Sequence, residues 1–189
     1  MVARRPNPLN PLGGNFHLMM DPTGSSDELS HTLLLTAYFL NPASKGEIRL
    51  AHPQPRTPPV IRVGYLSDPD GADLAALRTG VRLLREIAAQ PALCAIVAAE
   101  HSETAGLDGT ELDAYIRENF SDYAHPVGTC RMGSSADPAA VADARGVVRG
   151  TRNVIVADAS ATPTPVSANT NLTAMLLGYK LAGTALGHG

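Results

Sequence analysis

The apolar positions of the chain fall into two helical patterns. Between Asp70 and Gln90, apolar residues recur at spacings of three and four, which predicts an amphipathic helix that Pro91 ends. A second stripe predicts a last helix from Asn169 to about Leu186. The two stripes are Leu74, Leu77, Val81, Leu84 and Ile87, and then Leu172, Leu176, Tyr179, Ala182 and Leu186. Beside the first stripe lie three arginines that we expect to face solvent: Arg78, Arg82 and Arg85.

Short continuous apolar runs predict strands. Three such runs, at residues 31–40, 47–50 and 60–65, follow one another with turns and no helical pattern between them. This order predicts an antiparallel sheet or meander. A fourth run, at residues 154–157 just before Asp158, is typical of a strand that is buried on both faces.

Composition excludes several classes of protein. The chain has 189 residues, a formal net charge of -3 and a pI of about 6.0, whereas a nucleic-acid-binding protein normally has a basic face. No run of about 18 apolar residues occurs, so we expect neither a transmembrane helix nor a secretory signal. The chain has only two cysteines, and its histidines lack the spacing of metal ligands. We therefore expect a cytoplasmic protein without a metal site.

The stretch from Tyr123 to Gly133 carries the candidate chemistry. His125 precedes a Gly-Thr loop, and an imidazole can hold or release a proton near neutral pH. Farther on, a polar loop leads through Asn169 into the last helix, whose N-terminal amides stabilise nearby negative charge. Two plainer readings stay open, with His125 as an ordinary structural histidine and Asn169 as a helix cap.

These segments resemble the C-terminal part of the glucose–methanol–choline (GMC) family of FAD-dependent oxidoreductases. The resemblance covers roughly residues 32–186 and rests on His-x-x-Gly-Thr-Cys-x-Met-Gly from His125 and on Asp-Ala-Ser followed by Asn-Thr-Asn. It implies hydride transfer from an alcohol carbon to flavin. It also implies that His125 is the general base or hydrogen-bond partner of the substrate hydroxyl. Asn169 cannot act as a base, so its implied role is a hydrogen bond to the substrate oxygen.

The resemblance further implies contacts with FAD. The helix start at Thr170, Asn171 and Leu172 is expected to turn its amides toward the pyrimidine end of the flavin, where the reduced ring is anionic. Asp158 and Ala159 are expected to lie against the pyrophosphate and ribitol, mostly through backbone groups. All five positions are therefore expected to bind the cofactor.

The predicted fold class is α+β, with an antiparallel substrate-domain sheet and helices, followed by the C-terminal strand and helix of an FAD-binding α/β domain. The predicted parts are a Pro- and Gly-rich arm at 1–30, a GMC-like substrate domain at 31–122, and a C-terminal segment with the active-site loop at 123–189. The sequence contains no G-x-G-x-x-G, so the Rossmann N-terminal portion of the FAD-binding domain is expected to be absent from this chain.

That missing motif leaves three functions open. In the leading one, the chain is a module of a GMC-type enzyme that oxidises a small alcohol, together with a separate FAD-binding chain or as a homo-oligomer. In the second, it is a flavin-independent homologue that uses His125 for acid–base chemistry, as an isomerase, lyase or cyclase. In the third, it is a non-catalytic fragment from a split gene. No nucleic-acid partner is expected in any of them.

Overall fold

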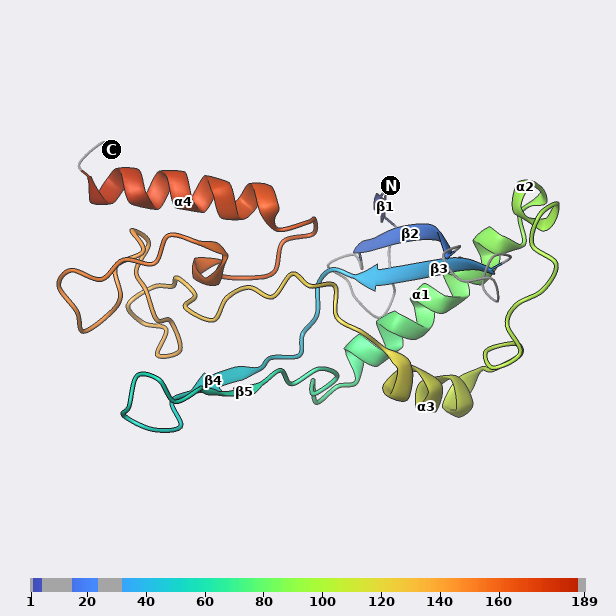
Figure 1. Cartoon of the computed structure of the whole chain (residues 1–189), viewed down its shortest axis with the longest axis horizontal. Coiled ribbons are helices and arrows are strands. Elements are labelled where there is room, and N and C mark those ends of the chain that lie inside the picture. Colours follow the sequence, from blue (N-terminus) through green and yellow to red (C-terminus); the bar gives the residue numbers. More distant parts are fainter. Residues whose placement is uncertain (1, 5–14, 24–31, 187–189) are drawn as a thin grey trace. The chain divides into compact units, whose positions relative to one another are not determined.

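The fold is described from a computed structural model, and the chain divides into two compact units (Figure 1). The structure describes three stretches of the chain: residues 2–4, 15–23 and 32–186. Unit 1 comprises Met1–Lys45 and Gly64–Ser121, and unit 2 comprises Gly46–Val63 and Asp122–Gly189. Within the described stretches, no helix is both long enough and apolar enough to cross a membrane.

Unit 1 contains a three-stranded antiparallel sheet in the order β1-β2-β3. Its strands are β1 (Val2–Arg4), β2 (Asn15–Thr23) and β3 (Thr32–Phe39). β3 confirms the strand predicted at 31–40, although His31 lies outside the described residues and the strand is only half-buried. Residues 1–30 were expected to form a Pro- and Gly-rich arm, and the described parts of this stretch are the strands β1 and β2. Phe16 of β2 pairs with Phe39 of β3, with ring centroids 5.7 Å apart, and such aromatic cross-strand pairs stabilise a sheet.

Three helices complete unit 1: α1 (Ala72–Ala88), α2 (Pro91–Cys94) and α3 (Gly109–Asn119). α1 confirms the first predicted helix, and its Leu74 forms a buried core with Leu112 and Ile116 of α3. Gly80 lets α1 approach the sheet closely, because a Cβ there would lie 3.1 Å from Cβ of Ala37 and from the Phe16 ring. The described chain thus has an α+β organisation, as predicted.

The hairpin of unit 2 corrects the predicted sheet. β4 (Glu47–Arg49) and β5 (Val60–Arg62) pair antiparallel with each other, and Ile48 lies opposite Ile61. The runs at 31–40, 47–50 and 60–65 therefore form strands but not one sheet. β3 pairs with β2, a strand that the hydrophobic pattern does not predict, and β4 and β5 form a separate two-stranded sheet.

The apolar run at residues 154–157 also differs from its prediction. It forms a single bridge, between Val147 and Ile155, and no strand of the described chain continues the pairing. Val154 and Ile155 are 49% and 37% exposed, so the run is not a strand buried on both faces. An apolar run predicts burial, but it does not supply the neighbouring strands that a buried strand needs.

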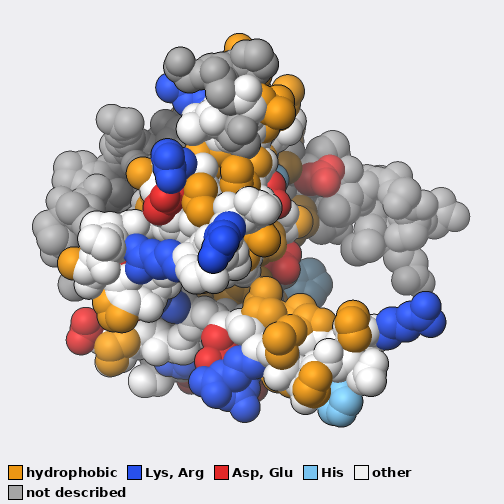
Figure 2. Space-filling model, turned by 90° about the vertical axis from the view of Figure 1, so that its left-hand side faces the viewer, with side chains coloured by type: hydrophobic (Ala, Val, Ile, Leu, Met, Phe, Trp, Pro, Cys, Tyr) orange, Lys and Arg blue, Asp and Glu red, His pale blue; other side chains and the backbone are white. Residues whose placement is uncertain are grey.

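The last helix, α4 (Asn171–Ala185), begins two residues later than predicted. Gly178 brings it close to the preceding segment, because a Cβ there would lie 3.2 Å from the carbonyl oxygen of Ala157. The stripe that the spacing marks is exposed in the described structure: Leu172 by 78%, Leu176 by 57% and Tyr179 by 82%. Figure 2 shows hydrophobic side chains, in orange, lying at the surface between charged ones.

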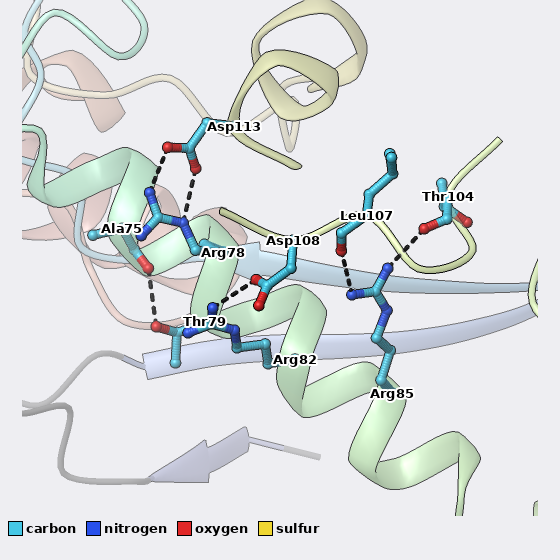
Figure 3. A network of polar contacts seen from close by, with 9 residues as sticks. All are labelled: Ala75, Arg78, Thr79, Arg82, Arg85, Thr104, Leu107, Asp108 and Asp113. Carbon is cyan, nitrogen blue, oxygen red and sulfur yellow. Dashed lines mark hydrogen bonds and ion pairs between the residues drawn. The ribbon is translucent and has the colours of Figure 1, made fainter. Parts of the chain in front are cut away.

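The arginines of α1 are not a simple solvated face (Figure 3). Arg78 makes a bidentate ion pair with Asp113 of α3, at 2.8 Å from Nε and 2.5 Å from Nη2. Arg85 donates to the carbonyl oxygens of Thr104 and Leu107, both at 2.8 Å. These contacts tie α1 to α3 and to the loop before it, so the prediction that Arg78 and Arg85 face solvent is wrong.

Candidate functional site

The loop that follows His125 lies against the Asp-Ala-Ser segment of unit 2. Gly128 N–H donates to the carbonyl oxygen of Ala159 at 3.4 Å, and Cys130 N–H donates to that of Ser160 at 2.9 Å. A third bond continues the row, from Met132 N–H to the carbonyl oxygen of Ala161 at 2.9 Å. These backbone hydrogen bonds hold two segments that are about 30 residues apart in the sequence side by side. His125 lies just before the first of these paired residues.

Gly128 makes this close pairing possible. Its φ of +80° lies in the left-handed region, and a Cβ there would lie 3.2 Å from the carbonyl oxygen of Thr162. A side chain at this position would be both strained and crowded. The glycine of the Gly-Thr pair therefore has a structural role behind the candidate histidine.

His125 is half-buried, and two side chains contact its ring. Thr170 Oγ1 lies 3.1 Å from Nδ1, where either atom can be the donor, depending on the imidazole tautomer. The ring of Tyr123 packs edge-on against the imidazole, with centroids 4.6 Å apart and planes at 88°. With Nδ1 held by Thr170, Nε2 is the ring nitrogen left for a substrate.

Asn169, the second predicted catalytic residue, joins the same cluster. Its side chain is exposed in the described structure, and its Oδ1 accepts a hydrogen bond of 3.0 Å from the hydroxyl of Tyr123. Tyr123 therefore contacts both predicted catalytic side chains. The sequence carries no signal for this role of Tyr123, because no local pattern marks a contact between residues 46 positions apart.

The N-terminus of α4 lies beside this cluster, because its N-cap residue contacts His125. Thr170 occupies the N-cap position, and its carbonyl oxygen accepts the first helical hydrogen bond, from Ala174 N–H at 2.8 Å. The Thr170 side chain does not cap the helix, because its hydroxyl contacts His125 instead. The first-turn amides, which include those of Asn171 and Leu172, have no partner within a helix, and both side chains are exposed. A helix N-terminus of this kind stabilises an anionic group, and a reduced flavin ring is anionic.

The Asp158 side chain is committed to local structure. Its Oδ1 accepts from the backbone N–H of Ser160 at 2.8 Å and from the Ser160 hydroxyl at 2.5 Å, which caps the short 3-10 helix η1 (Ala159–Ala161). Ala159 is half-buried and pairs with Gly128 through its carbonyl oxygen. A cofactor at Asp158 and Ala159 would therefore meet backbone groups more readily than a free carboxylate.

Arginines hold the loop that follows the Gly-Thr-Cys motif. Arg131 donates to both carboxylate oxygens of Asp137, at 2.6 and 3.1 Å, and this hydrogen bonding is the main reason that the pKa of Asp137 lies below its ordinary value. Arg149 donates to the carbonyl oxygens of Gly133, Ser134 and Asp137. Side-chain hydrogen bonds from Arg131 and Arg149 thus hold the loop that follows Cys130.

Among the described residues, no group of three or more His, Cys, Asp or Glu side chains is arranged to hold a metal ion. Cys130 is half-buried, and its backbone takes part in the loop pairing. The chemistry-bearing groups are therefore the imidazole of His125, the amide of Asn169 and the open first turn of α4.

Comparisons with known proteins agree on one family. The C-terminal sequence model of GMC oxidoreductases matches residues 42–178. Choline oxidase from Arthrobacter globiformis is 37% identical over 151 residues, which cover 78% of this chain and 27% of that protein.

Solved structures give the same result. Pyridoxine 4-oxidase from Mesorbium loti is 26% identical with a TM-score of 0.72, and the match covers 84% of this chain and 30% of that one. An FAD-dependent oxidoreductase from Chaetomium thermophilum is 25% identical with a TM-score of 0.72, over 94% of this chain and 28% of that one. The chain thus spans less than a third of the length of each of these proteins. On the match to residues 42–178, the chain belongs to the GMC oxidoreductase family.

Proposed function

We propose that this chain is the C-terminal module of an FAD-dependent GMC oxidoreductase that oxidises a CH–OH group of a small alcohol. The observation that carries the proposal is the cluster in which Tyr123 and Thr170 link His125 to Asn169 beside the open N-terminus of α4. The imidazole of His125, the amide of Asn169 and the first-turn N–H groups of α4 thus lie close together. These are the groups that alcohol oxidation with an anionic reduced cofactor requires.

The reaction separates a proton and a hydride. His125 takes the proton of the substrate hydroxyl through Nε2, while Nδ1 stays bonded to Thr170. Asn169 donates from Nδ2 to the substrate oxygen, since its Oδ1 is already bonded to Tyr123. When bound, FAD supplies the acceptor for the hydride from the substrate carbon. The alcohol thereby loses two electrons and becomes a carbonyl compound.

Residues of α4 and η1 are proposed to hold the cofactor. The backbone amides at Thr170, Asn171 and Leu172 present positive potential to the pyrimidine end of the flavin. Asp158 and Ala159 contact the pyrophosphate and ribitol through their backbone, which fits the local commitment of the Asp158 carboxylate. In this proposal residues 31–122 form the substrate domain, and residues 123–189 form the catalytic and flavin-facing segment.

The remaining contacts to FAD are proposed to come from a second polypeptide segment that carries the dinucleotide-binding half. Two observations support this. The relatives are more than three times as long as the part that this chain matches. The face of α4 formed by Leu172, Met175, Leu176 and Tyr179 is 57–82% exposed, and a stripe of this kind on one helix favours burial against a partner.

The proposal is tested by reconstitution. The chain is co-expressed with a GMC polypeptide that supplies the G-x-G-x-x-G half, ideally from the neighbouring reading frame, and the complex is purified. We expect a yellow complex that oxidises one or more of choline and a panel of primary alcohols. His125→Gln is expected to lower kcat by about 10² to 10⁴-fold, the range for loss of a general base.

The control is His52→Gln, which removes an exposed histidine of the β4–β5 hairpin loop and is expected to leave kcat unchanged. A complex that forms without flavin and converts a substrate without oxidising it would support the acid–base alternative instead. Full activity of His125→Gln in the yellow complex would refute the assigned role of His125.

A further inference from the structure

Tyr123 contacts both proposed catalytic side chains. Its hydroxyl donates to Oδ1 of Asn169 at 3.0 Å, and its ring packs edge-on against His125 at 4.6 Å. His125 is two residues farther along the chain, whereas Asn169 lies 46 residues away, immediately before Thr170. The tyrosine thus connects the loop that carries the base to the segment that leads into α4.

A strained turn sets the position of Tyr123. Ala124, between the tyrosine and the histidine, has a φ of +55°, in the left-handed region that L-residues other than glycine rarely adopt. Its N–H donates to Oδ1 of Asp122 at 3.0 Å, which closes a local turn. This conformation disfavours alanine by about 1–2 kcal/mol, so surrounding contacts must maintain it. The contacts of Tyr123 with His125 and Asn169 are such contacts.

We infer that Tyr123 is a positioning residue that orients the Asn169 amide, an inference that rests on the proposed function. An exposed asparagine can turn either end of its amide toward a substrate. A hydroxyl that donates to Oδ1 occupies the acceptor end, and it leaves Nδ2 as the end that faces the substrate oxygen. In this arrangement Tyr123 holds the acceptor end of the amide, and Asn169 presents a donor.

This orientation matters most in the transition state. As the hydroxyl proton leaves, negative charge grows on the substrate oxygen, and a donor that faces it becomes more stabilising than in the ground state. An amide that rotates freely does not keep its donor toward the substrate oxygen, so it stabilises this charge less. Loss of the Tyr123 hydroxyl should thus lower kcat more than it changes KM.

The test compares Tyr123→Phe with Tyr123→Leu in the reconstituted complex. Tyr123→Phe removes only the hydroxyl, and we expect kcat to fall about tenfold with KM changed less than about twofold. In an Asn169→Ala background the same substitution should have no further effect, because the group that it orients is gone. Tyr115→Phe, on α3, is the matched control and should leave kcat unchanged.

A second readout is independent of catalysis. In NMR spectra of the full chain, the Asn169 side-chain amide signals, identified by their loss in Asn169→Asp, should shift in Tyr123→Phe toward those of a freely rotating amide. The ring-proton shifts of His125 should be kept in Tyr123→Phe and change in Tyr123→Leu, which removes the packed ring. If these spectral changes occur but no alcohol is oxidised, the proposed function fails while the orienting contact stands.

Two results would overturn the inference. One is an equal loss of kcat from Tyr123→Phe with and without Asn169, which would indicate a general structural role. The other is an unchanged set of Asn169 amide signals in Tyr123→Phe, which would mean that the hydroxyl does not orient the amide.

Discussion

Oγ1 of Thr170 lies 3.1 Å from Nδ1 of His125, so the residue at the N-cap position of α4 contacts the candidate base instead of capping its own helix. Thr170→Val keeps the shape of the side chain and removes this hydrogen bond. We expect kcat of the reconstituted enzyme to fall about tenfold, because the imidazole loses the contact that holds Nδ1 and directs Nε2 to the substrate.

Thr170→Ser is the matched variant, since it retains a hydroxyl, and it should restore most of the activity. The same pair can be compared by ¹⁵N chemical shifts of His125, which report the tautomer of the ring. An unchanged tautomer in Thr170→Val, together with an unchanged kcat, would show that the contact has no role in positioning the base.

Two glycines with similar backbone angles should respond differently to alanine. Gly146 and Gly150 have φ values of +77° and +75°, so both substitutions are strained by about 1 kcal/mol. A Cβ at Gly146 would also lie 2.6 Å from the carbonyl oxygen of Val156, whereas nothing lies within 4 Å at Gly150. We expect Gly146→Ala to lower the free energy of unfolding by about 2–4 kcal/mol and Gly150→Ala by about 1 kcal/mol. Equal losses in urea unfolding would contradict the close approach at Gly146.

The sequence allowed prediction of features whose signal is local. The spacing of Leu74 and its stripe predicted α1, because a helix repeats its buried face every three or four residues. The histidine motif and the Asn-Thr-Asn motif identified His125 and Asn169 as candidates. The structure brings them into one cluster, and their catalytic roles stay predictions.

What the sequence did not reveal depends on partners that are distant along the chain. The run at 154–157 is apolar enough for a buried strand, but it lacks a neighbouring strand among the described residues. β2 was missed because its Gly- and Pro-rich surroundings are typical of loops, whereas its pairing with β3 stabilises it as a strand. The contact of Tyr123 with Asn169 spans 46 residues, and the positive φ of the neighbouring Ala124 is not signalled by alanine itself.

Acid should weaken unit 2 through Asp137. Hydrogen bonds from Arg131 hold the pKa of Asp137 below its ordinary value of 3.8, so the folded state favours the ionised carboxylate. This contribution to stability is present above the unfolded-state pKa and is lost as the pH falls through the lower folded-state pKa. The difference in unfolding free energy between the wild type and Arg131→Gln should therefore be largest near neutral pH and shrink below about pH 4.

Arg56→Gln is the control for that measurement, because it removes an exposed positive charge in the β4–β5 hairpin loop. Its effect on stability should be small and should not follow the titration of Asp137. If the effect of Arg131→Gln were as large at pH 3 as at pH 7, its cause would be lost packing of the arginine rather than the ion pair.

The two ion pairs of α1 with the segment around α3 should differ in strength. Arg78 and Asp113 are 28% and 22% exposed and form a bidentate pair, whereas Arg82 and Asp108 are 53% and 64% exposed. Removal of one partner of a half-buried, bidentate pair leaves a charge poorly solvated. We expect Arg78→Met to lower the unfolding free energy by about 1–3 kcal/mol and Arg82→Met to lower it less. The reverse order in thermal or urea unfolding would contradict this assignment.

Thr162, at the end of η1, has a buried hydroxyl with no hydrogen-bond partner among the described residues, and the residue is only 3% exposed. A buried hydroxyl without a partner is unfavourable, and Thr162→Val replaces it with a methyl group of similar volume. We expect this variant to be as stable as the wild type or more stable by up to about 1 kcal/mol.

Thr151→Val is the control, because the Thr151 hydroxyl donates to the carbonyl oxygen of Val148 at 2.7 Å and its loss should weaken that turn. A marked loss of stability in Thr162→Val alone would mean that this hydroxyl has a partner in the folded protein.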